Sequence, residues 1–410
     1  MTRLTKALLC CSALLIASSA HADDKLPAEV MHSWTSGGEA AAVQVIVDAF
    51  NARGGEWTDA SIAGFESANA AYTSRILSGN PPTARSVIFG LDQRELMEQG
   101  LLNNVDAVAA AGKWSDAVPA NLYATLGYDG HIYLAPISMH GESWMFYSKP
   151  VFEKAGIAAE PASWDEFFAD MDKIKAAGLV PIAWGGQAWQ ELKVFNAVLL
   201  SQLGVEGFGK AYAGDEATIK SDGFKKTVEI FGKMRDYVDP SAAGRNWNDA
   251  TAMVISGKAG VQFMGDWAKG EFINAGKALG TDYGCALAPG SDGMVIIGDA
   301  MAFPKTGKAE QDKAQALLAE VIMDPKIQVE FAKKKGSFPV RKDVDTSSLD
   351  ACAQKGVAML AAGKVAPEHA IIISPAKGGA VTDLIGEFWA NPAMTGDEVV
   401  EKFAAAVTEG

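Results

Sequence analysis

Hydrophobic positions along the chain switch repeatedly between strand-like and helix-like spacing. Residues 28–34 form a short, mostly apolar run that predicts a strand, and a glycine-bearing turn follows at 35–38. From Glu39 onward, apolar side chains recur at the i, i+3, i+4 and i+7 positions of one helix face. This order of strand, turn and helix is typical of α/β folds, which bind ligands at the carboxyl ends of their strands.

The same alternation continues to the end of the chain. Predicted strands occupy 61–65, 85–89, 131–136, 143–148, 260–264 and 294–297, the last of which leads through residues 298 and 299 to 301–304. Predicted helices occupy 69–77, 92–99, 164–177, 248–256, 308–323, 325–335 and most of the chain beyond 350, with a Gly- and Trp-rich loop at 182–190. The pattern therefore predicts an α/β protein whose mostly parallel sheet is covered by helices.

The first 22 residues have the pattern of a secretory signal peptide. Arg3 and Lys6 precede a short apolar run, and Ala20-His21-Ala22 resembles a cleavage site. A buried N-terminal helix is the alternative, and a lipoprotein anchor is disfavoured because no small residues precede the cysteine pair of this segment. No later stretch has the length and apolarity of a membrane helix. We therefore expect an exported, periplasmic protein.

Length, charge and cysteine content narrow the class further. About 390 residues would remain after cleavage, which exceeds what one core usually organises and favours two lobes. The full chain carries a net charge of −14, and loss of Arg3 and Lys6 brings it to −16, so a nucleic-acid partner is not expected. Cys285 and Cys352 would remain, either as a disulfide, which an exported chain favours, or as two buried thiols.

Signatures of enzymes are absent from the sequence. Gly290-Ser291-Asp292-Gly293 lacks the spacing of a nucleophile elbow, and neither a phosphate-binding loop nor a zinc-protease motif occurs. The four histidines beyond the signal segment have no short ligand spacing. We expect neither a catalytic site nor a metal or other cofactor. The alternative of a glycosidase that uses a pair of carboxylates stays open, because any folded chain offers candidate carboxylates.

Tryptophans beside polar residues are the most informative feature. An indole can cover the apolar C–H face of a sugar ring, while carboxylate, amide or ammonium groups bond its hydroxyls. Each tryptophan alone is more simply a core residue, and we interpret Trp57, Trp114, Trp164 and Trp389 as structural. Four lie in polar loops and together favour a polyol site, with Glu39 and Lys335 as charged partners: Trp34, Trp189, Trp247 and Trp267.

At these residues the chain resembles a known family, the periplasmic solute-binding proteins of ABC sugar importers (extracellular solute-binding protein family 1), and most closely the glucose-binding members. The resemblance covers nearly the whole chain after the signal segment. Its matching segments are 34–39 (WTSGGE), 185–190 (GGQAWQ), 245–248 (RNWN), 260–272 (GVQFMGDWAKGEF), 335–337 (KGS) and 369–370 (HA).

The resemblance implies two α/β lobes with crossover strands between them and a cleft that closes on the ligand. We expect lobe 1 at 23–136 plus 300–343 and lobe 2 at 137–299 plus 344–410. It also implies that Trp34 stacks on the sugar, that Glu39 accepts from its hydroxyls, and that the remaining contacts come from His140, Trp189, Trp247, Trp267, Asp299, Lys335 and His369.

The chain departs from the family at positions expected to face the ligand. Ser33 replaces the first of two tryptophans, Phe89 stands where a lysine is expected, and Ile297 stands where an asparagine is expected. An unpaired polar group costs about 1–3 kcal/mol, so such exchanges alter specificity. We therefore expect a monomer that captures glucose, a related hexose or a small glycoside and delivers it to inner-membrane ABC permease subunits. A sugar acid or another small polar solute is the alternative ligand, and a secreted carbohydrate-active enzyme is the alternative class.

Overall fold

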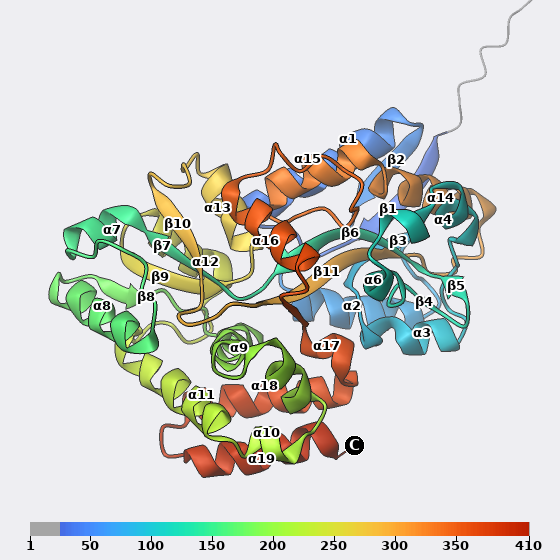
Figure 1. The fold of residues 1–410 in the computed structure, drawn as a ribbon. Helices are drawn as coiled ribbons and strands as arrows, with labels where there is room; N and C mark the ends of the chain where they lie inside the picture. Colours follow the sequence, from blue (N-terminus) through green and yellow to red (C-terminus); the bar gives the residue numbers. More distant parts are fainter. Residues whose placement is uncertain (1–24, 410) are drawn as a thin grey trace, which may run out of the picture.

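The computed structural model describes residues 25–409, and the predicted signal peptide at 1–22 lies outside this range. Two lobes are visible, each built around a sheet with helices packed on it (Figure 1). Within residues 25–409, no helix is long and apolar enough to cross a bilayer. The predicted two-lobed α/β class is therefore confirmed.

The larger sheet has the strand order β12-β11-β3-β1-β2, and β6 pairs with β11. Its strands are β1 (Leu26–Met31), β2 (Gly55–Asp59), β3 (Ala84–Ile88), β6 (Leu134–Gly141), β11 (Met294–Ala302) and β12 (Val365–Pro367). β1 runs parallel to β2 and β3, whereas β11 runs antiparallel to β3 and β6. The carboxyl ends of β1, β2 and β3 therefore share one edge of lobe 1.

The smaller sheet of lobe 2 has the order β10-β7-β9-β8. Its strands are β7 (Trp144–Ser148), β8 (Val180–Ile182), β9 (Ala259–Met264) and β10 (Tyr283–Leu287), and a separate hairpin joins β4 (Gly127–Tyr128) to β5 (His131–Ile132). β9 runs parallel to β8 and antiparallel to β7.

Helices cover both sheets and form a bundle at the base of lobe 2 (Figure 1). In the first half of the chain they are α1 (Gly37–Ala52), α2 (Phe65–Leu77), α3 (Arg94–Glu98), α4 (Asp106–Ala111), α5 (Trp114–Ala117), α6 (Ala120–Tyr123), α7 (Lys149–Lys154), α8 (Trp164–Ala176) and α9 (Ala188–Tyr212). The others are α10 (Glu216–Ile219), α11 (Asp222–Lys233), α12 (Trp247–Ile255), α13 (Trp267–Asn274), α14 (Ala309–Ile322), α15 (Pro325–Lys335), α16 (Ala351–Ala361), α17 (His369–Ile372), α18 (Pro375–Ala390) and α19 (Gly396–Thr408), with short 3-10 helices η1 (Leu91–Gln93) and η2 (Met234–Tyr237).

The chain passes between the two sheets more than once. β6 of the larger sheet leads through Glu142 and Ser143 into β7 of the smaller sheet, and β10 leads back into β11. β11 is a nine-residue strand whose register shifts between Asp299 and Ala300. The lobe boundaries that we expect, after residues 136 and 299, fall inside β6 and β11 and remain a proposal.

Three local predictions were wrong. The second strand is β2 at 55–59, not 61–65, because its backbone pairs with β1 from Leu26↔Gly55 to Val30↔Asp59, while 61–64 forms the approach to α2. α9 starts at Ala188, inside the loop expected at 182–190. The strand expected at 294–297 is longer than predicted, because β11 continues through the glycine at 298 to Ala302.

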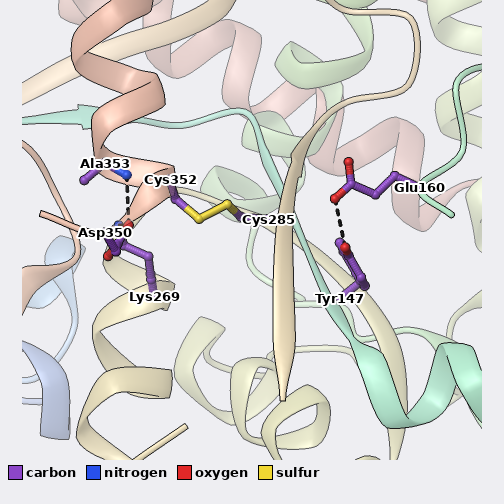
Figure 2. The surroundings of a disulfide bond; sticks show 7 residues. All are labelled: Tyr147, Glu160, Lys269, Cys285, Asp350, Cys352 and Ala353. Carbon is purple, nitrogen blue, oxygen red and sulfur yellow. Dashed lines mark hydrogen bonds and ion pairs between the residues drawn. A yellow bond between two sulfur atoms is a disulfide. The ribbon is translucent and has the colours of Figure 1, made fainter. Parts of the chain in front are cut away.

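A disulfide joins Cys285 of β10 to Cys352 of α16 (Figure 2). The two Cα atoms lie 6.4 Å apart, within the range that a disulfide bridges. Beside it, the buried ammonium of Lys269 lies 2.7 Å from Asp350 Oδ1, which also accepts a bond from Ala353 N at the start of α16. The predicted disulfide is confirmed over two free thiols, and α16 is thereby fixed to lobe 2.

Candidate functional site

Six of the predicted site residues come from elements that meet where the lobes join. Trp34 and Glu39 follow β1, and Trp267 opens α13 directly after β9. Lys335 is the last residue of α15, while His140 and Asp299 lie on the neighbouring strands β6 and β11. Strand ends of both sheets therefore contribute side chains to one region.

The first cluster consists of Trp34, Glu39 and Lys335. Lys335 Nζ lies 2.6 Å from Glu39 Oε1 and 5.3 Å from the centroid of the Trp34 ring. Glu39 Oε2 also accepts a bond from Ser36 Oγ at 3.1 Å. Gly336, at a φ of 90°, ends α15 where a Cβ would meet the carbonyl of Asp266, so this turn requires glycine. The turn holds the ammonium beside the indole and the carboxylate.

The second cluster surrounds the buried imidazole of His140. Its Nδ1 lies 2.6 Å from Asp266 Oδ1, and its Nε2 lies 2.9 Å from both Asp299 Oδ2 and Ser138 Oγ. Asp266 Oδ2 accepts a second bond from Gly141 N at 2.9 Å. The ring of His140 is therefore held in one orientation between two carboxylates.

This arrangement decides the charge of the second cluster. Burial disfavours the imidazolium, but Asp266 and Asp299 outweigh burial and raise the pKa of His140 to about 9. Burial likewise opposes ionisation of Asp299, yet His140 and Lys335 hold the pKa of its carboxyl below its usual range. At neutral pH, His140 is a cation that donates toward both carboxylates.

The two clusters adjoin each other. The indole of Trp267 meets the ring of His140 edge to face, with centroids 5.7 Å apart and planes at 68°. The Lys335-Gly336 turn packs against the backbone of Asp266, which precedes Trp267. Both clusters therefore form one continuous surface, largely buried in this structure, that combines two indoles, two cations and three carboxylates.

Trp189 and Trp247 form a separate pair of loop ends in lobe 2. Trp189 Nε1 donates to Gln187 Oε1 at 3.0 Å, and Gln187 Nε2 donates to Asn246 Oδ1 at 3.2 Å. Gln262 of β9 donates to the carbonyl of Trp247 at 2.9 Å. Both indoles are half-buried at the end of the sheet from which Trp267 also emerges. Their part in a wall of the site stays a prediction.

His369 belongs to a different network from the other predicted residues. Its Nδ1 pairs with Glu368, and its ring stacks on Tyr212 with centroids 5.5 Å apart. Lys193 Nζ joins Glu368 Oε1, at 2.8 Å, to Glu142 Oε1, at 2.7 Å. Because Glu142 lies between β6 and β7, this network ties α9 and α17 to the passage between the lobes.

Two of the three departures from the resembled family, Phe89 and Ile297, lie beside the second cluster, and Ser33 precedes Trp34 of the first. Phe89 is buried over the backbone of Gly298, where a Cβ would collide with its ring. Ile297 is buried and pairs in register with His140, while Ser33 lies between the buried side chains of His32 and Trp34. Apolar side chains therefore cover the strand beside Asp299.

Sequence reasoning missed several buried groups. Asp266 could have been found, because it follows β9 directly and precedes a candidate tryptophan. Lys193, Glu142 and Glu368 offered no signal, since they lie far apart in sequence and meet only in the fold. Among residues 25–409, no cluster of three or more His, Cys, Asp or Glu side chains is arranged to hold a metal ion.

Comparison with known proteins extends the picture. Residues 34–323 match the family model described as "Bacterial extracellular solute-binding protein". A "Probable sugar-binding periplasmic protein" of Brucella melitensis is 43% identical, covering 84% of this chain and 82% of that one. A protein of the same description from Rhizobium meliloti is 40% identical over 96% of both chains. The solved structure of a chitin oligosaccharide binding protein superposes with a TM-score of 0.79 at 19% identity, over 94% of this chain and 99% of that one.

These matches are to periplasmic solute-binding proteins and not to enzymes, which confirms the location and the class predicted from the sequence. The solved structure supports the two-lobed fold alone, because its identity is low. The family model covers more than two thirds of the chain, and the relatives extend over most of the remainder. The chain therefore belongs to the bacterial extracellular solute-binding proteins.

Proposed function

We propose that the protein captures a neutral monosaccharide, glucose or a related hexose, or a small glycoside of it, and delivers the sugar to the permease of an ABC importer. The observation that carries this proposal is the surface on which Trp34 and Trp267 flank charged side chains. Indoles suit the apolar face of a pyranose, and charged groups bond its hydroxyls. The sugar-binding descriptions of two relatives at 40% identity or more support the same class.

The charge of the surface favours a neutral ligand. Two cations, Lys335 and His140, face three carboxylates, so the sum is one negative charge, and both cations already contact carboxylates. A sugar acid would add an anion without an unpaired cation to receive it, which is costly in a buried site. The alternative of a sugar acid is therefore weaker than a neutral sugar.

Binding would exchange partners within the surface rather than fill unsatisfied groups. Sugar hydroxyls would form hydrogen bonds with Glu39 and Lys335, which now bond each other. They would also approach Asp299 from the side opposite His140. Contacts from both lobes would then favour a closed form over an open one, because the ligand stabilises only the state in which both sets are made. We expect the closed monomer to be the form that docks on the permease.

Calorimetry on the refolded protein tests the proposal. The panel contains glucose, galactose, mannose, xylose, methyl glucoside, glucosamine and glucuronic acid. Refolding matters because a ligand carried through purification would mask binding. Micromolar or tighter binding of a neutral sugar without product formation supports the proposal. Preference for glucuronic acid would overturn the assignment of a neutral sugar. If none of these compounds bound, the proposal that the ligand is a sugar would be wrong.

A further inference from the structure

The start of α1 meets the middle of α13, although the two helices follow different sheets. α1 follows β1 of the larger sheet, and α13 follows β9 of the smaller sheet. Figure 1 shows α13 beside both α1 and α15. A Cβ on Gly38 would lie 2.5 Å from the carbonyl carbon of Gly270, and a Cβ on Gly270 would lie 2.8 Å from the carbonyl oxygen of Lys335. The backbones of α1, α13 and α15 therefore approach more closely here than any residue larger than glycine would allow.

This contact supplies the N-terminal cap of α1. The segment from Ser36 to Glu39 has the spacing of a capping box, in which the serine would accept a bond from the amide of the glutamate. Within the described part of the chain, the Ser36 hydroxyl accepts no bond from the helix and instead donates to Glu39 Oε2 at 3.1 Å. The amide of Gly38 donates to Glu271 Oε1 at 2.8 Å. A carboxylate of α13 therefore caps α1, and its negative charge also suits the positive end of the helix dipole.

The cap from α13 leaves Glu39 available to a ligand. In a capping box the carboxylate of Glu39 would turn back to the amide of Ser36. Here its Oε1 lies 2.6 Å from Lys335 Nζ on the proposed sugar surface. The carbonyl of Lys335 in turn packs against Gly270. Residues 270 and 271 of α13 therefore hold both members of this ion pair in place, Glu39 through α1 and Lys335 through α15.

We infer that Glu271 is a positioning residue for the bound sugar. It holds α1 against α13 and so sets the distance from Glu39 and Lys335 to Trp267, which lies one turn earlier on α13. The side chain acts through the amide of Gly38 and does not touch the ligand. The inference rests on the proposed function and deepens it, because it assigns part of the retention of the sugar to a contact outside the site.

The origin of the two helices predicts how this contact affects the kinetics of binding. Because α1 and α13 follow different sheets, their contact belongs to the closed form and breaks when the lobes separate. A sugar enters the open form, in which the contact is not yet made. Loss of the contact should therefore speed the release of the sugar and leave its association rate unchanged.

The test uses the full refolded protein with glucose, or with the sugar of the panel that binds most tightly if glucose does not bind. Calorimetry gives the dissociation constant, and stopped-flow tryptophan fluorescence gives the two rates. Glu271→Ala removes the cap, whereas Glu271→Gln keeps an oxygen that accepts the bond from Gly38. Glu153→Ala, at an exposed glutamate of α7, is the matched control.

A second variant keeps the test decisive where Glu271→Ala does not fold. Gly38→Ala places a methyl group against the backbone of Gly270, so α1 and α13 cannot approach. Alanine is also a better helix former than glycine, so the exchange suits α1 itself. Gly38→Ala should therefore weaken sugar binding at least as much as Glu271→Ala. An affinity equal to that of the wild type would contradict the inference.

We expect Glu271→Ala to weaken sugar binding about fivefold, the scale of one lost helix cap, through faster release at an unchanged association rate. Glu271→Gln should retain most of the affinity, and Glu153→Ala should change neither rate. Wild-type affinity and release in Glu271→Ala, or equal losses for the alanine and glutamine variants, would overturn this inference alone. If no sugar of the panel bound the wild type, the proposed function would be wrong and this inference with it.

Discussion

The charge of His140 makes the stability of the protein depend on pH in a defined window. Its folded-state pKa of about 9 lies above the value of 6.5 expected in the unfolded chain. A group whose pKa is raised on folding contributes fully below the unfolded value and loses its contribution as pH rises through the folded one. The contribution of His140 is therefore complete below pH 6.5 and lost by about pH 9.

The size follows from the difference between the two pKa values. About 2.5 units at about 1.4 kcal/mol each give about 3 kcal/mol, and the free energy of unfolding should fall by up to about 1.4 kcal/mol per pH unit inside the window. Burial makes this conversion appropriate, since His140 is 1% exposed. Burial also raises the pKa of Glu142 to about 7, so the total pH dependence has more than one source.

Urea unfolding of the ligand-free protein at half-unit steps from pH 6 to pH 10 measures the effect. His140→Gln removes the titrating group, and the difference between wild type and variant cancels the contribution of Glu142. We expect that difference to shrink by about 3 kcal/mol across the window. His131→Gln is the control: Asp106 also raises the pKa of this exposed histidine, but solvent screens the pair, so its difference from wild type should change far less across the window. A constant difference between wild type and His140→Gln would refute the reasoning.

Three further predictions concern binding and stability. Trp267→Ala should weaken sugar binding by about 1–3 kcal/mol through lost stacking and apolar burial, and unchanged affinity in calorimetry would remove it from the site. Lys335→Gln should cost about 1.5–3 kcal/mol of binding, the range for a bond to a charged group, while thermal unfolding tests whether the variant folds. The double variant Cys285→Ser/Cys352→Ser should lose up to about 4 kcal/mol of stability, because the disulfide closes a 67-residue separation, and equal urea midpoints for both proteins would contradict this.

The parts of the fold carried by local periodicity were predictable. α15 occupies the expected 325–335, and α8, β3 and β9 lie within a residue of their predicted bounds. Residues 55–59 were missed because their apolar content is low. An edge strand is specified by pairing with β1 and not by a hydrophobic run. Such long-range pairing has no signature in a short window of sequence.

The site shows the same division. Trp34, Glu39 and Lys335 were reached from residue type and loop position, and their mutual contacts agree with that interpretation. The orientation of His140 depends on Asp266, more than a hundred residues away in the sequence. Partners so far apart in the sequence come together only because β6 and β11 pass between the sheets, which a single sequence does not reveal.

The passage of the chain between the lobes also constrains the order in which the protein can fold. The larger sheet contains β1 at its beginning and β11 and β12 near its end, so it stays incomplete until residue 367 of 410 is available. Contacts between residues so distant in sequence form slowly. Fragments that end before β11 should therefore leave the amides of β3 exposed to hydrogen exchange, whereas the full chain protects them. For an exported protein this delay is favourable, because the first lobe cannot close into a finished structure while the rest of the chain is still crossing the membrane.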